Sequence, residues 1–336
     1  MATDYAGAVR NGTGAAGRLQ RELGIRDLIE VHGGSIDIFD AIRMLDLPLM
    51  LRPLKGLLGA YLSVPVPGIL VTTERSMSIQ RFTAAHELGH CILQHEPSLD
   101  DESVLRRMPN SPEPSGKFQE AEADAFAVAF MIPKWLIAAH CRRQNWTTAD
   151  LSHPHVTYQL SLRLGASYEA TCRTFERYRL LPAPTVKRLL DTQPRTMKTE
   201  LLRDYKPVNY RGDVWHLTER DAGSRIDGSR NDTFVLSLKE HGASGFIWDF
   251  DALVSSGFAI VRDLREAVDS HTVGGAAIRR VTAVSDDIPR GTLALEERRP
   301  WLPAQPLSQI SLHVDLSGPE QPGLSRAERR HLLQAV

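Results

Sequence analysis

Three residues in the stretch RFTAAHELGHCILQH, residues 81–95, have the types and the spacing of a metal site. His86 and His90 are four residues apart, and a helix turns about 100° per residue, so their imidazoles would lie about 40° apart on one face. Two imidazoles so placed can bind one Zn²⁺ ion, and Glu87 would flank them without taking a ligand position. Zinc lowers the pKa of its water toward about 7, and a neighbouring carboxylate can take the proton as the hydroxide attacks a carbonyl. The spacing therefore predicts metal-dependent hydrolysis.

The alternative interpretation of this stretch is a surface helix that happens to be rich in histidine. A buried catalytic helix is favoured by the apolar residues around the motif, which are Phe82, Ala85, Leu88, Gly89, Ile92 and Leu93. On one continuous helix, His95 would lie about 140° from His90, so we expect it at the surface and not as a ligand. Cys91 would lie about 100° from the ligand face and is expected to be a small core residue.

A catalytic zinc ion needs a third protein ligand and an open position. The segment EAEAD, residues 120–124, offers carboxylates at helical spacing: Glu120 and Asp124 would share one face, while Glu122 would point about 200° away. We favour Glu120 as the third ligand, with Asp124 holding the other N–H of a ligand histidine and so fixing its tautomer. A solvated acidic face is the alternative for these carboxylates.

The elements that carry these residues follow from local sequence signals. Polar capping residues and Pro97 predict a helix over about 76–95, and a second helix is expected within GKFQEAEADAFAVAFMIP, residues 116–133. The segment GILVTT, residues 68–73, is the clearest strand upstream of them. Residues 1–15 are small and rich in Gly and Ala, so we expect a loose arm there.

The composition changes after Leu181, where a proline-rich stretch without strong periodicity begins. We therefore expect a metallopeptidase domain over 1–181, a linker over 182–212, a β-domain over 213–316 and a polar tail over 317–336. After the linker, short runs of alternating apolar and polar residues are separated by turn residues. This pattern is typical of an all-β sandwich or barrel.

The bulk composition limits which partners the chain attracts. Its 336 residues exceed what one hydrophobic core usually needs, so two domains are expected. The formal net charge is −1, so no global field draws the chain to nucleic acid or to an anionic membrane. The three cysteines are scattered and odd in number, which favours a reducing compartment. Because no signal peptide and no run near 18 apolar residues is apparent, we expect a cytoplasmic protein with no membrane contact.

The motif QRFTAAHELGHCILQH, followed by EAEADAFAVAFMIP, resembles the ImmA/IrrE family of zinc metallo-endopeptidases. The resemblance covers about residues 18–180 and includes a strand upstream of the catalytic helix. It implies one zinc ion per chain and an α+β zincin-like domain, mostly helical with a small sheet. The roles that it implies are zinc ligands for His86, His90 and Glu120, general base for Glu87, and the last position of a downstream ExxA[ND] motif for Asp124.

Members of this family characteristically cleave helix-turn-helix repressors. The resemblance therefore implies a protein substrate with a regulatory role, a transcriptional repressor of a stress response or of a mobile element. The region before the catalytic helix leaves no room for a DNA-binding helix-turn-helix, so we expect no direct binding of nucleic acid.

The blocks FVLSLKEHGASGFIW, VGGAAIRRVTAV, GTLALEERRPW and ISLHVDL, within 213–316, resemble chagasin-type inhibitors of papain-like cysteine peptidases. This resemblance implies an immunoglobulin-like β-sandwich that presents three loops to a partner. The residues at matching loop positions are Gly245, Phe246, Trp248, Gly274, Gly275, Arg299, Pro300 and Trp301. The first loop reads HGASGFIW and lacks the Asn, Pro, Thr and Tyr of its NPTTGYxW counterpart. We therefore favour a module that recognises a substrate or partner over an active inhibitor, and Trp248 and Trp301 have the alternative of being core residues.

The sequence thus predicts a zinc endopeptidase followed by a recognition domain. One alternative is a non-catalytic sensor or anti-repressor that only binds its partner, and another is a cysteine-peptidase inhibitor acting through the second domain. No spacing selects an oxyanion-stabilising residue among the available candidates His153, His155, Tyr158 and Tyr168.

Overall fold

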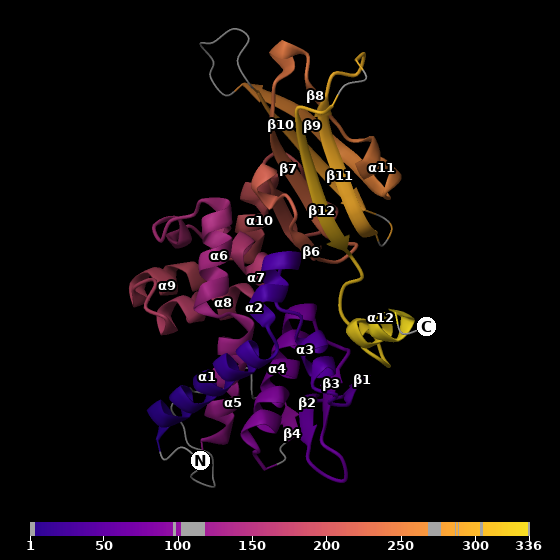
Figure 1. Cartoon of the computed structure of the whole chain (residues 1–336). Coiled ribbons are helices and arrows are strands. Elements are labelled where there is room, and N and C mark those ends of the chain that lie inside the picture. The colour runs from indigo at the N-terminus through magenta and orange to yellow at the C-terminus, as the bar shows by residue number, and fades with distance from the viewer. Residues whose placement is uncertain are drawn as a thin grey trace.

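The computed structural model describes residues 4–96, 99–101, 118–267, 277–285, 287, 289–302 and 305–334. A mostly helical region with a small sheet comes first, and two larger β-sheets follow it at the other end of the molecule (Figure 1). The fold class expected from the sequence, α+β followed by an all-β sandwich, is confirmed.

The chain begins with three helices, α1 (Tyr5–Glu22), α2 (Ile25–His32) and α3 (Ile38–Met44). The expectation of a loose arm over residues 1–15 is wrong for residues 5–15, because α1 packs along a later helix through its small residues. A Cβ atom at Gly12 would lie 2.1 Å from the carbonyl oxygen of Glu122. The Gly and Ala residues therefore serve close helix–helix contact rather than flexibility.

A four-stranded sheet follows, with the strand order β1-β3-β2-β4. Its strands are β1 (Leu49–Arg52), β2 (Leu57–Leu62), β3 (Gly68–Thr72) and β4 (Leu99–Asp101). β1 runs parallel to β3, and the other pairs are antiparallel. The strand expected over 68–73 is β3.

The helix that carries the HExxH motif is α4 (Met77–Leu93), which packs against β2 and β3. Ser76 precedes its first turn, and Gln94 ends it in the left-handed conformation, with φ 55°. The helix is therefore slightly shorter than the expected 76–95, and His95 lies outside it.

The next two helices are α5 (Gln119–Met131) and α6 (Lys134–Gln144). Contrary to the sequence expectation, the stretch Gln119–Gln144 is long and apolar enough to resemble a membrane span, with a mean hydropathy of 1.3. This resemblance is weak, because 61% of the apolar window is buried inside the protein and the core helix of a soluble protein gives the same signal.

The helical region continues through η2 (Asp150–Ser152), α7 (Pro154–Leu164) and α8 (Tyr168–Arg177). The range 182–212, expected to be a linker, contains α9 (Ala183–Leu190) and α10 (Pro194–Leu202). α9 packs into the N-terminal core through Val186 and Leu189. α10 contributes to a separate cluster between the two regions, formed by Tyr158, Met197, Leu201, Leu202, Val214 and Val235.

Two four-stranded sheets with the orders β5-β7-β10-β9 and β6-β12-β11-β8 form the second region. The first contains β5 (Val214–Leu217), β7 (Thr233–Glu240), β9 (Phe258–Ala267) and β10 (Ala277–Ser285). The second contains β6 (Arg225–Asp227), β8 (Ile247–Asp249), β11 (Arg290–Arg298) and β12 (Ser308–Asp315). Three short helices connect these strands, η3 (Glu219–Asp221), η4 (Gly242–Ser244) and α11 (Asp251–Ser255).

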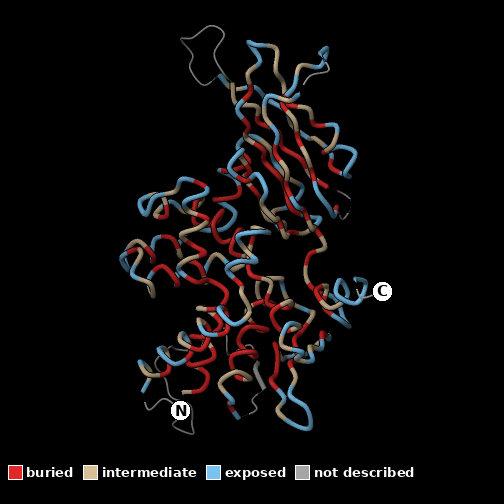
Figure 2. The backbone as a smooth tube through the Cα atoms, viewed as in Figure 1, coloured by how far each residue is buried: buried red, intermediate tan, exposed pale blue. Residues whose placement is uncertain are grey.

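One apolar cluster contains residues of both sheets, so the sheets face each other as a sandwich. Phe234 and Val281 come from one sheet, and Leu295 and Leu312 come from the other. Figure 2 shows buried residues concentrated between these sheets and around the central helices of the first region.

The end of the chain returns to the helical region (Figure 1). Gly323 forms an antiparallel bridge with Leu51 of β1, and α12 (Arg326–Gln334) packs against α3. Helix α4 is also tied to the sandwich, because Arg81 lies 3.1 Å from the carboxylate of Asp227 in β6. The range 317–336, expected to be a polar tail, thus contains a helix docked on the first region.

Candidate metal centre

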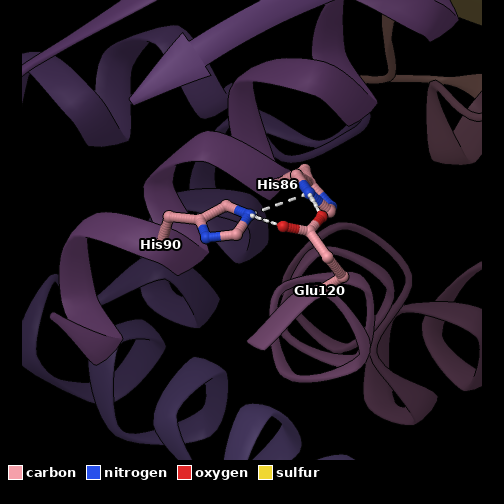
Figure 3. A group of neighbouring side chains, drawn as sticks. All are labelled: His86, His90 and Glu120. Atoms are coloured by element: carbon pink, nitrogen blue, oxygen red, sulfur yellow. Dashed lines mark hydrogen bonds and ion pairs between the residues drawn. The ribbon is translucent and has the colours of Figure 1, made fainter. Parts of the chain in front are cut away.

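His86 and His90 of α4 and Glu120 of α5 point toward one another (Figure 3). The two Nε2 atoms are 3.0 Å apart. Oε2 of Glu120 lies 3.2 Å from Nε2 of His86, and its Oε1 lies 3.6 Å from Nε2 of His90. The three residues that the sequence nominated as ligands are therefore brought together by two packed helices.

These distances fit a tetrahedral zinc site. Bonds of about 2.0–2.2 Å to imidazole nitrogen and carboxylate oxygen place ligand atoms about 3.3–3.6 Å apart. The observed separations of 3.0, 3.2 and 3.6 Å lie close to this range. Two imidazoles and one carboxylate are also a donor set that suits zinc and leaves its fourth position open.

The three groups are buried, and the environment of Glu120 favours the ionisation state that a metal ligand needs. His86 is 1% exposed, His90 is 0% exposed and Glu120 is 7% exposed. Burial alone would raise the pKa of Glu120, but hydrogen bonds from His86 and His90 outweigh it and hold this pKa far below its usual range. The carboxylate is therefore ionised at neutral pH, as a ligand must be.

Asp124 lies one turn beyond Glu120 on α5, beside the other nitrogen of His86. Its Oδ1 atom is 2.9 Å from Nδ1 of His86. The negative charge of a carboxylate at this distance favours a proton on Nδ1, which would leave the lone pair of Nε2 for a metal. The structure thus places Asp124 where the sequence argument put it.

Glu87 is fully buried, on the side of α4 that faces β2. A Cβ atom at Gly59 of β2 would come within 2.8 Å of Oε1 of Glu87 and within 2.5 Å of a methyl group of Thr83. The absence of a side chain at Gly59 therefore makes room for the Glu87 carboxylate between α4 and β2. Sequence reasoning did not identify Gly59, because its role depends on a contact between a strand and a helix.

The expectation that His95 lies at the surface is wrong. It is 4% exposed, with Nδ1 at 3.0 Å from Nδ1 of His90 and Nε2 at 2.7 Å from Oε2 of Glu122. The helical angle misled the prediction, because α4 ends before His95 and the backbone turns at Gln94. Burial lowers the pKa of His95, although its hydrogen bond to Glu122 acts in the opposite direction. The lowered pKa favours a neutral imidazole.

Cys91 lies outside the ligand group, as expected, and is half-buried. Burial raises the pKa of its thiol, while its hydrogen bond with Tyr61 lowers it. All three cysteines of the chain are free.

The oxyanion candidates make contacts of a structural kind. The hydroxyl of Tyr158 donates to Asp213, that of Tyr168 donates to the carbonyl of Leu189, and His155 lies 3.1 Å from Glu200. His153 stacks on His155. None of them belongs to the ligand group among the described residues.

The candidate loops of the sandwich lie at its end away from the helical region (Figure 1). The guanidinium of Arg299 lies 4.4 Å from the ring centre of Phe246, and the indole of Trp301 lies against Gly245. Trp301 is 71% exposed, whereas Trp248 is 2% exposed and donates to the carbonyl of Lys239.

Trp248 is therefore a core residue of the sandwich, and its ring is not part of the loop surface. Pro300 lies in the turn with Trp301. Gly274 and Gly275 lie outside the described residues.

The first region of the chain matches a known protein family. Residues 42–176 match the family model Peptidase_M78, the IrrE N-terminal-like domain, within the range of the resemblance seen in the sequence. This match supports a metallopeptidase-like role for the first region, and the His-His-Glu group within it can hold a metal ion. No curated protein matches the chain.

Solved structures that resemble the C-terminal region include a cysteine protease inhibitor. The inhibitor EhICP2 from Entamoeba histolytica is 22% identical, with 32% of this chain and 99% of that chain covered and a TM-score of 0.27. Amebosin is 21% identical, with 31% and 96% covered and a TM-score of 0.26. PbICP-C, solved in complex with falcipain-2, is 11% identical, with 33% and 96% covered and a TM-score of 0.22.

Proposed function

We propose that this chain is a zinc-dependent endopeptidase that cleaves a regulatory protein, a helix-turn-helix transcriptional repressor of a stress response or mobile element. The observation that carries the proposal is the group of His86, His90 and Glu120, together with the buried Glu87 that follows His86 in the same helix. The match of residues 42–176 to a peptidase family supports the same chemistry.

The chain's own residues perform three tasks in this proposal. His86, His90 and Glu120 hold the ion, and Asp124 keeps the proton of His86 on Nδ1. When bound, zinc supplies Lewis-acid activation of water and polarisation of the scissile carbonyl. Glu87 accepts the proton of the attacking water and passes it to the leaving amine.

Glu87 separates an enzyme from a protein with a structural metal. A carboxylate with no exposed surface is costly to ionise unless its surroundings compensate. A purely structural zinc site closes its coordination with four protein ligands and has no use for a general base. Three ligands and a neighbouring Glu87 therefore favour hydrolysis over a non-catalytic sensor or anti-repressor.

The sandwich serves in this proposal to recognise the protein substrate in the cytoplasm. Phe246, Arg299 and Trp301 form one contiguous surface, and Trp301 is largely exposed. Exposed aromatic and arginine side chains are the types that most often anchor protein interfaces.

Inhibition of a cysteine peptidase is the second candidate, because the same loop surface is available to it. Titration of the full-length Glu87→Gln protein against a papain-like enzyme tests this alternative. Lack of inhibition at micromolar concentrations would remove it.

The main proposal is tested by incubating purified repressors, starting with the product of the neighbouring gene, with wild-type and Glu87→Gln protein. Intact-mass analysis should show two complementary fragments with wild-type protein only, while zinc content remains equal in both proteins. Cleavage that persisted in zinc-loaded Glu87→Gln protein would contradict the assignment of Glu87. Repressor release without cleavage by either protein would support the non-catalytic alternative.

A further inference from the structure

The two histidine ligands are supported in different ways at their second nitrogen atoms. Nδ1 of His86 faces the carboxylate of Asp124, which is 36% exposed on its side chain. Nδ1 of His90 instead faces Nδ1 of another imidazole, His95, at 3.0 Å. His90 is thus linked to its carboxylate through an intermediate ring.

The chain of contacts continues inward from His95. Its Nε2 atom lies 2.7 Å from Oε2 of Glu122, and Oε1 of Glu122 accepts a hydrogen bond of 3.0 Å from the side-chain amide of Asn11. The side chains of His95 and Glu122 are only 1% and 3% exposed. The relay therefore runs from α4 through α5 to α1 inside the protein.

Hydrogen-bonding rules leave one arrangement of protons along this relay once His90 binds a metal through Nε2. That nitrogen must offer its lone pair, so the ring proton of His90 is on Nδ1 and donates to Nδ1 of His95. Nδ1 of His95 is then an acceptor, so its proton is on Nε2 and donates to Glu122. Each donor along the relay finds an acceptor, and the relay ends at the carboxylate of Glu122.

We infer that His95 and Glu122 are positioning residues, which fix the tautomer and ring orientation of His90 and increase its strength as a metal ligand. This inference rests on the metal site of the proposed function. Carboxylates that hydrogen-bond a ligand histidine have this effect in metal sites, and their removal typically weakens metal binding about 10–100-fold. Here the imidazole of His95 lies between His90 of α4 and Glu122 of α5, so the carboxylate acts on His90 through this ring.

The local structure explains why the relay has this form. Glu122 is two residues from Glu120, so it lies on a different face of α5 and cannot reach His90 directly. The left-handed residue Gln94 turns the chain back, which brings His95 under the last turn of α4. The close approach of α1 at Gly12 then places Asn11 against Glu122.

The test measures the affinity of the full-length apoprotein for Zn²⁺ by competition with a chromophoric chelator. The variants are His95→Leu, which breaks the relay, His95→Gln, which keeps one acceptor and one donor, and Glu122→Gln, which removes the charge with little change of shape. His140→Phe is the matched control, because His140 is a buried histidine that contacts the carbonyl of Gly34 outside the metal centre.

We expect zinc dissociation constants to rise about 10–100-fold for His95→Leu, with a smaller rise for His95→Gln and Glu122→Gln, and no change for His140→Phe. Circular dichroism of the apoproteins identifies variants that have unfolded. If His95→Leu does not fold, the near-isosteric Glu122→Gln decides the question. Wild-type affinity in the folded His95 and Glu122 variants would overturn the inference, since a purely structural role alters stability and not metal affinity.

The result also separates this inference from the proposed function. Wild-type protein that bound no zinc at this site would refute both. Wild-type protein that bound zinc but cleaved no repressor would refute the peptidase proposal, while the affinities of the His95 variants would still decide the role of the relay.

Discussion

The metal centre and the loop surface of the sandwich are built in opposite ways. At the metal centre, the residues that would do the chemistry are themselves buried, and His86, His90 and Glu87 are at most 1% exposed. In the loops, Trp301 is 71% exposed, and the buried groups are supports beneath it. One region is therefore preorganised for an ion, whereas the other exposes a large aromatic side chain, as the proposed recognition of a protein substrate would require.

Buried carboxylates organise both regions, with different roles. Glu120 points its oxygens at the two histidines. Beneath the loops, Glu240 accepts from the backbone N–H of Trp248, and Glu297 accepts from that of His241, and both carboxylates have no exposed surface. Because ionised groups are costly to bury, each carboxylate fixes the geometry of the groups that compensate it.

The largest effect is expected from removing a metal ligand, which should abolish the function of the metal centre and leave the sandwich unchanged. Glu120→Ala removes the third ligand, so we expect zinc affinity to fall by more than about 100-fold and peptidase activity to be lost. Zinc titration of the apoprotein and a cleavage assay measure these effects. Glu169→Ala, at an exposed carboxylate of α8, is the control and should match wild-type protein. If Glu120→Ala bound zinc with wild-type affinity, a residue other than Glu120 would have to be the third ligand.

The contact between the two regions gives the next largest effect. Asp227 lies against Arg81 of the catalytic helix, with the two side chains 11% and 6% exposed. Removing one partner of a buried ion pair leaves an uncompensated charge, so Asp227→Asn should lower the free energy of unfolding by about 3–5 kcal/mol at pH 7. Denaturant unfolding measures this, and Arg26→Gln in the exposed pair with Glu30 is the control.

We also expect the loss of stability in Asp227→Asn to depend on pH. Burial raises the pKa of Asp227, but the charges of Arg81 and Arg225 outweigh it and lower this pKa below its usual value. A lowered folded-state pKa contributes stability above the unfolded value of about 3.9, and this contribution disappears as the pH falls through the folded-state pKa. The stability difference between wild type and Asp227→Asn should therefore narrow below about pH 4. A difference independent of pH would contradict this electrostatic origin.

A smaller effect is expected where the sheet meets the catalytic helix. Gly59→Ala would press a methyl group on Thr83 and Glu87, so we expect a loss of about 1–3 kcal/mol of stability and a lower kcat with unchanged zinc affinity. Gly14→Ala, at a position of α1 where a Cβ would make an ordinary contact of 3.5 Å with the flexible side chain of Arg18, is the control and should stabilise by about 0.5–1 kcal/mol. Unaltered kcat in Gly59→Ala would show that Glu87 tolerates displacement.

The three candidate metal ligands could be predicted from the sequence because the spacing of residues along a helix determines which side chains share a face. His86 and His90 lie within one helix, and Glu120 lies in a second helix whose periodicity is clear. His95 was misplaced, since its position depends on the residue at which α4 ends. Asn11 could not be found, because its contact with Glu122 spans 111 residues and depends on how α1 packs.

In the fold, too, features with a local sequence pattern were predicted, and features that depend on distant contacts were not. Alternating apolar residues located the longer strands of the sandwich, since that pattern survives only where one face is buried. The helices α9 and α10 were missed because their prolines were interpreted as breakers, whereas both prolines lie in the first turn, where the missing N–H costs nothing. The bridge between Gly323 and Leu51 left no local signal.

The smallest expected effect tests the loop side of the comparison. Trp301→Ala should change the free energy of unfolding by less than about 0.5 kcal/mol, because the ring is mostly exposed. If the loops bind the substrate, kcat/KM for the repressor should fall about 10-fold, while cleavage of a short peptide and zinc affinity stay at wild-type values. Val254→Ala, also exposed on the sandwich but on α11, is the matched control. An equal loss for repressor and peptide would mean that Trp301 acts through the metal centre, and the division between a buried chemical site and an exposed recognition surface would then fail.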